Sequence, residues 1–473
     1  MHSKFLRSSA TLLASLALVP CAISAEEKKP NIIYIIVDDM GYGDLSCYGQ
    51  KGWKTPNIDT LATEGMKFTS HYSGSTVCAP ARSCLMTGQD QGHTYIRGNG
   101  PLQLRKEDTV VAELVKAAGY TTGMIGKSCV TGNTQDAQCP HDCGFDYFYG
   151  TLSHMTAHHH YPKSVWHNGK AEEIPGNNVK SGEVFIQNRY TDKALDFVTN
   201  NKEKPFMLVL SYSTPHADVC APEEDVKPFI GKFENEKAYK GGHYKACKHL
   251  KATYAGMVAN LDKNVGRLLA KLKELGLEEN TVVSFTSDNG PHNAGGYHYN
   301  MHDSNGVLRG GKRDLYEGGI RVPFLVKWPA KIKAGSSCDH PSAFWDFLPT
   351  ACELAGAEIP GNIQGVSYVP SMLGKEQPKH PFLYWEFHEQ GGKVALRQGD
   401  WKLVGLNRSS NNPRPYELYN LKDDLEESKN LAKENPEKVK ELAKLLENHR
   451  SPSENKKWNF NAGGGNKKNK KNK

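Results

Sequence analysis

Two pairs of oxygen-bearing side chains follow short apolar runs in this sequence. Asp38 and Asp39 come directly after Asn31–Val37, and Asp288 and Asn289 come directly after Thr281–Ser287. Adjacent carboxylates such as Asp38 and Asp39 repel each other unless a cation or protons neutralise them. Hard divalent cations prefer oxygen ligands of this kind. Either pair alone is also an ordinary turn signal, so the metal interpretation depends on the two runs being neighbouring strands.

A lysine and a histidine follow two further apolar runs. Lys127 comes shortly after Thr121–Ile125, and His216 follows Phe206–Tyr212 within Thr214-Pro215-His216. In open parallel sheets, ligands bind beyond the carboxyl ends of the strands. Three acids, an amide, a lysine and a histidine would then gather at one edge of one sheet. That coincidence favours a functional cation-binding site over four unrelated turns.

The most specific local pattern is Cys78-Ala79-Pro80-Ala81-Arg82. Pro80 fits the first turn of a helix and Gly88 fits its end. Cys78 then lies at the helix N-terminus, where unpaired N–H groups favour an anion. Arg82 is one turn further along the same side and is placed to neutralise that anion. The alternative is a buried free cysteine before a short helix.

Strand-like and helix-like patterns alternate through most of the chain. Val322–Trp328 is predicted to be another strand, the apolar spacing of Tyr254–Leu275 predicts a helix, and Phe344–Ala355 is the last predicted helix of this part. The chain has 473 residues, of which 38% are hydrophobic, so it can bury a sizeable core. These patterns predict an α/β fold with a mostly parallel sheet sandwiched by helices.

The pattern changes after a Pro- and Gly-rich connection at residues 360–381. Four short, closely spaced strands precede a helix with an apolar face at Val439–Leu446. The predicted strands are Phe382–Glu386, Val394–Arg397, Trp401–Gly405 and Tyr416–Tyr419. We therefore predict a large domain at 26–360 and a small antiparallel-sheet-and-helix domain at 361–460. Residues 461–473 are rich in Gly, Asn and Lys and predict a disordered basic tail.

Residues 1–25 have the order of a secretory signal peptide: a basic start, an apolar stretch and a cluster of small residues. The apolar stretch is too short to span a bilayer, and Pro20 before Cys21 disfavours a lipoprotein signal. We expect export to the periplasm or the extracellular space, without stable membrane insertion. The formal net charge of +7 lies at the termini, since residues 1–25 carry two positive charges and 461–473 carry five. The remainder is neutral, which argues against a nucleic-acid partner.

Ten cysteines remain after removal of residues 1–25. An oxidising compartment permits disulfides, although the sequence does not give their pairing. Cys139 and Cys143 bracket His141, with Cys129 nearby. This spacing is not that of a standard zinc site, so a disulfide or buried thiols are favoured over zinc.

Cys78–Arg82 also resembles the C-x-P-x-R maturation signature of type I sulfatases. Further segments resemble that family in the same order along the chain, over about residues 30–455. They are Asn31–Asp44, Gly126-Lys127, Pro215-His216, Ser287–Gly290 and Gly310–Pro323. The resemblance implies an alkaline-phosphatase-like fold with a catalytic domain and a smaller C-terminal domain. It also implies a sulfatase of the bacterial carbohydrate-sulfatase type.

The resemblance further implies that a maturation enzyme oxidises Cys78 to formylglycine, whose hydrated aldehyde supplies an oxygen nucleophile. One Ca²⁺ ion would polarise the sulfate. Its ligands would be Asp38, Asp39, Asp288, Asn289 and the modified Cys78. Arg82 and Lys127 would hold the diol oxygens and the developing charge. Lys312 would contact the sulfate, and His216 would protonate the leaving oxygen.

One segment departs from the family pattern. Many relatives carry a histidine two residues after the equivalent of Lys127, and this sequence reads Gly126-Lys127-Ser128-Cys129. The base for release of sulfate is therefore open, and the run His158-His159-His160 is either a substitute or a polar loop lining the substrate pocket.

The long polar tract Asp288–Arg313 resembles carbohydrate sulfatases more than enzymes acting on small aryl esters. We expect saccharide contacts from His158, His292, Asp303, Arg309 and His388, although ordinary loop polarity explains each of them equally well. Two other functions stay open. One is a formylglycine-dependent phosphonate or phosphate ester hydrolase, and the other is a non-catalytic protein that binds sulfated glycans.

Overall fold

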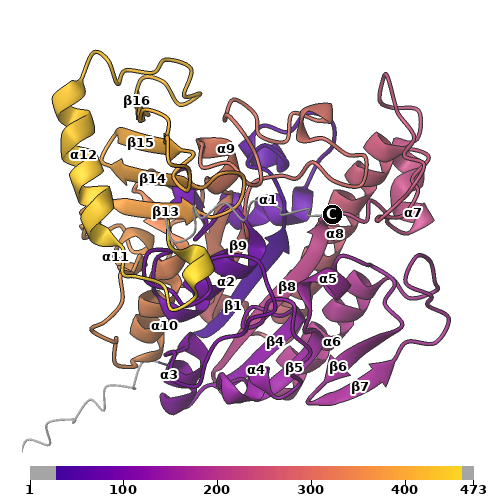
Figure 1. The fold of residues 1–473 in the computed structure, drawn as a ribbon. Helices are drawn as coiled ribbons and strands as arrows, with labels where there is room; N and C mark the ends of the chain where they lie inside the picture. The colour runs from indigo at the N-terminus through magenta and orange to yellow at the C-terminus, as the bar shows by residue number, and fades with distance from the viewer. Residues whose placement is uncertain (1–27, 461–473) are drawn as a thin grey trace, which may run out of the picture.

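The computed structural model describes residues 28–460, so the predicted signal peptide at 1–25 and the predicted tail at 461–473 lie outside the described residues. A ten-stranded sheet forms the centre of the larger part of the molecule (Figure 1). In spatial order its strands are β11 (Ser336–Cys338), β2 (Met66–Phe68), β10 (Phe324–Lys327), β9 (Thr281–Ser287), β1 (Asn31–Asp38), β8 (Phe206–Pro215), β4 (Thr121–Lys127), β5 (Tyr147–Thr151), β6 (Ser164–His167) and β7 (Lys170–Glu173).

The four strands that lead to the candidate residues are adjacent and parallel. β1 pairs with β8 on one side and with β9 on the other, and β8 pairs with β4. Every residue of β1, β8 and β9 is buried, which is expected for strands covered on both faces. The carboxyl ends of all four strands therefore lie at one edge of the sheet, as predicted.

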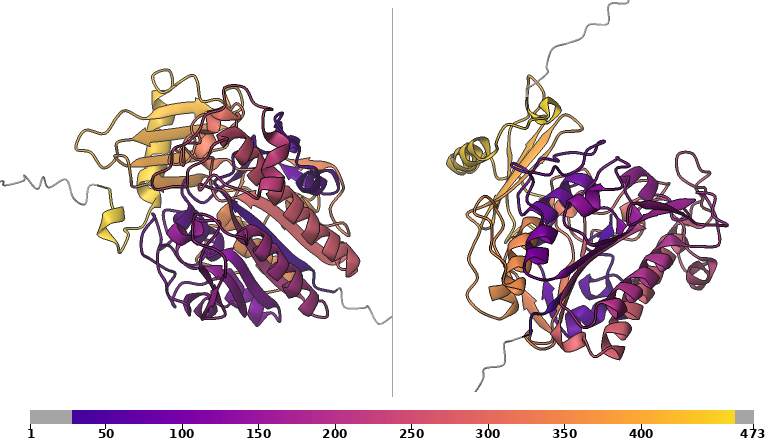
Figure 2. Two further views of the ribbon diagram at one scale, coloured as in Figure 1. Left: turned by 90° about the vertical axis from the view of Figure 1, so that its right-hand side faces the viewer. Right: turned by 90° about the horizontal axis from the view of Figure 1, so that it is seen from below.

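Helices cover both faces of this sheet (Figure 2). One face carries α1 (Pro56–Thr63), α6 (Ile186–Asn200) and α8 (Leu250–Glu274), and the other carries α2 (Cys78–Thr87), α3 (Val111–Ala117) and α10 (Phe347–Ala355). Successive side chains of β1 alternate between the two cores: Ile33 packs with the first group and Tyr34 with the second. This arrangement confirms the predicted α/β fold class.

The outer strands differ from the simplest prediction. The run Val322–Trp328 forms a shorter strand, β10, and it pairs antiparallel with both β9 and β2. Strands β2, β11, β5, β6 and β7 are not among the predicted strands. β2, β11, β6 and β7 have only three or four residues each, and β6 and β7 are rich in polar side chains, so they lack the continuous apolar signal of a central strand.

A four-stranded antiparallel sheet follows, as predicted. Its strands are β13 (Leu383–Phe387), β14 (Lys393–Gln398), β15 (Trp401–Leu406) and β16 (Glu417–Asn420), and α12 (Pro436–His449) packs on one face. The other face buries Trp385 and Val404 against Tyr72 and Trp345 of the larger part. The shorter elements are β3 (His71–Tyr72), α4 (Cys139–Asp142), α5 (His154–Ala157), α7 (Glu223–Val226), α9 (Glu317–Ile320), β12 (Ser342–Ala343) and α11 (Val369–Met372).

Buried charges join this small sheet to the larger part. Lys402 on β15 is fully buried, and its Nζ lies 2.8 Å from Glu317 and 2.9 Å from Glu427. Glu317 also accepts a hydrogen bond of 2.7 Å from the Tyr72 hydroxyl. Burial alone would raise the pKa of Glu317, but Lys402 and Arg321 lower it to about 2. Burial raises the pKa of Glu427 to about 7.

Replacing Lys402 with Met should lower the free energy of unfolding by about 3 kcal/mol, because two buried carboxyl groups lose their shared cation. Denaturant unfolding followed by tryptophan fluorescence measures the change. Lys271→Met is the control, since its partner Glu274 is 63% exposed and a surface pair contributes less than about 1 kcal/mol. Equal losses in the two variants would contradict this role for Lys402.

Asp44, in the loop after β1, is a buried carboxyl group for which the described residues provide no ion pair. Its Oδ2 accepts hydrogen bonds of 2.8 Å from the Gly41 N–H and from the Tyr254 hydroxyl. Burial raises the pKa of Asp44 to about 7. The folded protein therefore holds a proton that the unfolded chain releases at roughly pH 4.

This proton makes Asp44 a source of pH-dependent stability. The contribution is complete below about pH 4 and is lost as the pH rises through about 7, so the free energy of unfolding should fall across this window. Asp44→Asn should reduce that fall by roughly 1–4 kcal/mol. Denaturant unfolding at several pH values measures it, and an unchanged pH dependence in the variant would refute the assignment.

Candidate active site

Four oxygen-bearing side chains meet at the ends of β1 and β9. Asp38, Asp39, Asp288 and Asn289 are all fully buried. The Asp39 N–H donates a hydrogen bond of 3.1 Å to Asp288 Oδ1, and Asn289 Nδ2 donates one of 2.7 Å to Asp39 Oδ1. The parallel pairing of β1 with β9 brings together residues about 250 positions apart in the chain.

A cationic side chain faces each of the three carboxylates. Lys127 Nζ lies 2.5 Å from Asp38 Oδ2. Lys312 Nζ lies 2.6 and 2.8 Å from the two oxygens of Asp39. The Arg82 guanidinium contacts Asp288 Oδ2 at 2.8 and 3.0 Å. The formal charges of these six side chains cancel. Each of the six side chains is at least nine-tenths buried or lines one shared cavity.

The pKa values reflect this crowding. Burial and the neighbouring Asp38 raise the pKa of Asp288 to about 7, against the lowering effect of Arg82. Burial acts in the same direction on Asp38, but Lys127 and His216 hold the pKa of Asp38 well below its usual range. Asp38 therefore favours its ionised form, whereas burial disfavours the ionised form of the neighbouring Asp288. A bound cation would remove this conflict.

Unpaired oxygens indicate where such a cation fits. Within residues 28–460, neither Asp38 Oδ1 nor Asn289 Oδ1 has a hydrogen-bond partner, although both are buried. Asp38, Cys78 and Asp288 each present a ligand atom, and these atoms lie within 4.8 Å of one another. Buried oxygen donors without partners are the ligand type that Ca²⁺ and Mg²⁺ prefer. The donor set therefore fits a hard divalent cation.

Cys78 is the first residue of α2, as predicted, and Gly88 ends that helix with a φ of 68°. The helix N-terminus is held by Asn99, whose Oδ1 accepts a hydrogen bond of 3.2 Å from the Ala79 N–H and lies 3.8 Å from Cys78 Sγ. Burial raises the pKa of the Cys78 thiol, and Lys127 opposes that shift. The sequence offered no signal for Asn99, because its contact depends on how the loop after α2 folds back.

Cys78 opens into a cavity of about 470 Å³. The cavity is lined by Asp39, Cys78, Asn99, His158, His216, Tyr244, His292, Asn293, Ala294, Lys312, Arg313, Asp314 and Gln390. Gln390 comes from the small C-terminal sheet region, so both parts of the chain form its wall. Of the five predicted saccharide contacts, the cavity therefore includes His158 and His292.

Three imidazole rings form a stack along the cavity. The His216 ring lies 3.8 Å from that of His158 and 5.6 Å from that of His292, measured between centroids. His216 Nδ1 contacts the Ala217 carbonyl, and its Nε2 lies 3.2 Å from Asp39 Oδ2. Burial and Lys312 hold the pKa of His216 well below its usual range.

The other three predicted saccharide contacts lie outside this cavity. Asp303 lines a separate surface hollow beside His302. Arg309 stacks on the Tyr316 ring at 3.8 Å and donates a hydrogen bond to the Glu427 carbonyl, so it joins the two parts of the chain. His388 is held by Glu386 at 2.8 Å. Arg309 and His388 are thus engaged in contacts within the protein, and substrate contact by Asp303, Arg309 and His388 stays a prediction.

The site of the missing histidine is occupied by Cys129, which is buried and accepts a hydrogen bond of 3.4 Å from Arg82 Nη1. His154 Nε2 contacts the Ser128 carbonyl at 3.0 Å, and its other ring nitrogen has no partner in the described part of the chain. Within the histidine run, His159 pairs with Asp218 at 2.9 Å, outside the lining of the cavity. His158 is thus the member of that run that faces the cavity.

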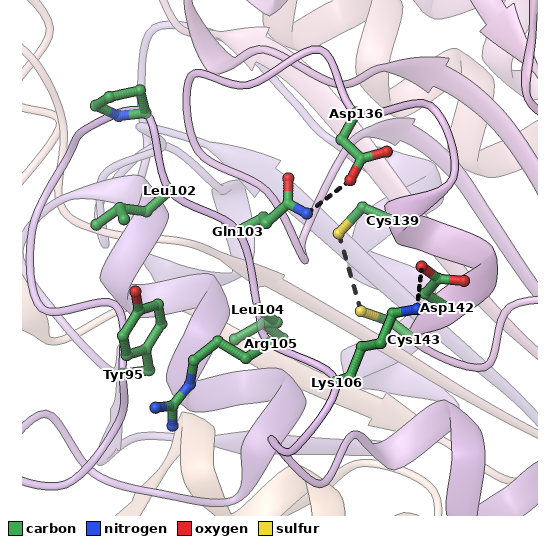
Figure 3. A pocket seen from close by; sticks show the side chains of 11 residues that line it. Tyr95, Leu102, Gln103, Leu104, Arg105, Lys106, Asp136, Cys139, Asp142 and Cys143 are labelled. Carbon is green, nitrogen blue, oxygen red and sulfur yellow. Dashed lines mark hydrogen bonds and ion pairs between the residues drawn. The ribbon is translucent and has the colours of Figure 1, made fainter.

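A second cavity, of about 400 Å³, contains the Cys139 and Cys143 pair (Figure 3). Their sulfur atoms are 4.0 Å apart, and all ten cysteines within residues 28–460 are free thiols. His141 Nδ1 lies 2.9 Å from the Phe145 carbonyl. The structure therefore supports buried thiols at this motif, in preference to a disulfide.

Within residues 28–460, no helix has the length and apolar character needed to cross a bilayer.

Comparisons with known proteins identify the family of the chain. The family model named Sulfatase matches residues 30–357, and one described as N-sulphoglucosamine sulphohydrolase, C-terminal, matches residues 310–453. The chain is 29% identical to the N-acetylgalactosamine-6-O-sulfatase of Bacteroides thetaiotaomicron, over 89% of this chain and 93% of that relative. It is 30% identical to the N-acetylgalactosamine-6-sulfatase of Canis lupus familiaris, over 79% of this chain and 72% of that relative.

A solved structure is similar over nearly the same length. Ps i-CgsB in complex with k-i-k-neocarrahexaose superposes with a TM-score of 0.75 at 29% identity, over 89% of this chain and 92% of that one. The fold, the acidic site and these matches lead to one assignment. The chain belongs to the sulfatase family of sulfuric ester hydrolases, and within it to the bacterial carbohydrate-sulfatase type.

Proposed function

We propose that this protein is an exported, formylglycine- and Ca²⁺-dependent sulfatase that acts on a sulfated carbohydrate. The observation that carries the proposal is the position of Cys78. It lies at the start of α2 and lines the same cavity as Lys312 and His216. Export is inferred from residues 1–25, and the cysteine would require a formylglycine-generating maturation enzyme as a partner.

The metal and the modified cysteine each have a defined place in this proposal. The ion would be held by Asp38, Asp39, Asp288, Asn289 and the modified Cys78. When bound, it would polarise the sulfate group and add two positive charges to a neutral cluster. The formylglycine would supply a hydrated aldehyde as the oxygen nucleophile.

The remaining side chains divide the work of binding and proton transfer. Arg82 and Lys127 are fixed by carboxylates, so their charges stand ready beside Cys78 without reorganisation. Lys312 lines the cavity and would bind the sulfate oxygens. His216 keeps Nδ1 on the Ala217 carbonyl, so Nε2 is the nitrogen that would protonate the leaving oxygen. A bound sulfate anion would raise its low pKa and favour that proton.

A carbohydrate substrate is supported by the cavity wall and by the printed names of the relatives. Tyr244 and His292 present aromatic rings, and Asn293 and Gln390 present amides, a combination that suits the apolar faces and hydroxyl groups of a sugar. Two relatives are named as N-acetylgalactosamine-6-sulfatases. We therefore place 6-O-sulfated amino sugars first among the substrates to be tried.

The test compares matched sulfate and phosphate esters with a panel of sulfated saccharides, using protein matured in a host that makes formylglycine. We expect sulfate release from a saccharide and no faster turnover of the matched phosphate ester. Faster phosphate turnover would favour a phosphate or phosphonate ester hydrolase. Binding without turnover, together with unmodified Cys78 in native-host protein, would favour a non-catalytic glycan-binding protein.

Lys312→Ala should lower kcat/KM for the sulfated substrate by about 100-fold, because the sulfate loses a cation within its cavity. Steady-state kinetics measures this change. Lys327→Ala is the control: it removes a lysine that is likewise paired with acidic side chains, Glu64 and Glu278, but at the far end of β10. An equal loss in both variants would assign a structural role to Lys312.

A further inference from the structure

A second cluster of metal-binding side chains lies away from the active site, at the opposite end of α2 from Cys78. Asp90 and His93 belong to the loop after α2, and His449 is the last residue of α12. Asp90 Oδ1 lies 2.7 Å from His93 Nδ1, and Asp90 Oδ2 contacts His449 Nε2. One ligand atom from each of these residues lies within 4.8 Å of the other two.

These three side chains are held in place by their surroundings. Asp90 is buried, and its Oδ1 also accepts a hydrogen bond of 3.0 Å from the Gly92 N–H. The His449 ring packs against Phe382 and Tyr384, with centroids 4.8 and 5.1 Å away. Little side-chain entropy remains to be lost when a ligand binds, which favours affinity.

The donor set indicates which ligand would bind. Two imidazole nitrogens and one carboxylate oxygen suit a borderline transition-metal dication, whereas Ca²⁺ prefers oxygen donors alone. His93 and His449 are 25% and 16% exposed at their side chains, so an ion can enter from solvent. A fourth position is left for water.

We propose that Asp90, His93 and His449 form a transition-metal site, with Zn²⁺ as the fitting ion, that fastens α12 to the larger part of the chain. His449 lies 359 positions after Asp90 in the sequence, so a metal here would cross-link the two parts of the molecule. The site uses none of the residues assigned to sulfate hydrolysis, and the proposal does not depend on that function.

The first experiment titrates Zn²⁺ into the intact protein in buffer with excess Ca²⁺, by calorimetry and by thermal unfolding. We expect one Zn²⁺ to bind and to raise the unfolding temperature. His93→Gln and His449→Gln should each weaken Zn²⁺ binding by roughly 100-fold. Co²⁺ added to the unaltered protein should give the visible absorption of a nitrogen- and oxygen-ligated ion, a readout that does not depend on the folding of a variant.

His167→Gln is the matched control. His167 Nδ1 lies 3.1 Å from Glu172, so this pair has a histidine and a carboxylate but no second imidazole within the described residues. Its loss should leave Zn²⁺ binding unchanged. The proposal is overturned if Zn²⁺ fails to bind, or if it binds equally well to all three variants. It is also overturned if His93→Gln and His449→Gln only lower stability by the same amount with and without Zn²⁺.

Discussion

Cys78→Ala is expected to lower kcat/KM for a sulfated saccharide by about 10⁴-fold or more, a loss typical of removing a nucleophile from a preorganised site. Cys78 is the thiol that lines the cavity with Lys312 and His216. An alanine fits the same backbone and removes only the sulfur atom. Steady-state kinetics on protein from a maturation-competent host measures the loss, and circular dichroism checks the fold.

Cys84→Ala provides the matched control. Cys84 lies on the same helix and is fully buried, but its sulfur contacts the Gly74 carbonyl and does not line the cavity. This variant should keep activity within a few-fold of the unaltered protein.

Mass spectrometry of the peptide that contains Cys78 should find an aldehyde in place of the thiol. Cys78→Ala activity within tenfold of the unaltered protein would refute the nucleophile assignment.

The central strands could be predicted because strands that are buried on both faces consist of nearly continuous apolar residues. Asn31–Val37 is an almost continuous apolar run, and it becomes β1 with every residue buried. The residues after such strands are then placed by topology alone, because parallel neighbours end at the same edge. The sequence alone therefore predicts that Asp38, Lys127 and Asp288 lie at one edge of the sheet.

The cavity wall could not be predicted in the same way. Asn99, Tyr244 and Gln390 lie on loops, where position depends on tertiary contacts and not on a local repeat. Polarity alone does not show where a loop side chain points: Arg309 is a charged residue within the expected substrate tract, and its guanidinium stacks on the Tyr316 ring. The role of a loop residue can therefore be assigned only when its contacts in the folded protein are known.

The charge balance of the active site explains why a cation and a sulfated substrate would depend on each other. Three carboxylates and three cationic side chains cancel within the cluster formed by the ends of β1, β4 and β9, α2 and the segment around Lys312. A neutral cluster attracts anions weakly. With a divalent cation the cluster carries two positive charges, so a sulfate ester is drawn in. Substrate capture is thus expected to fail when the cation is absent.

Asp38→Asn tests this balance with the smallest change in shape. The amide keeps the size of the carboxylate but leaves Lys127 without its partner at 2.5 Å, so the cluster becomes positive before the cation arrives. A cation that loses one carboxylate ligand and meets an unpaired lysine should bind about 4 kcal/mol more weakly, which corresponds to a rise of about 10³-fold in the Ca²⁺ concentration needed for half-maximal activity. Calcium titration of activity after chelation measures it. Asp44→Asn, six residues further along the chain and equally buried, should leave the calcium requirement unchanged. If Asp38→Asn needs no more Ca²⁺ than the unaltered protein, Asp38 is not a ligand, and the cation must be held by the remaining acids.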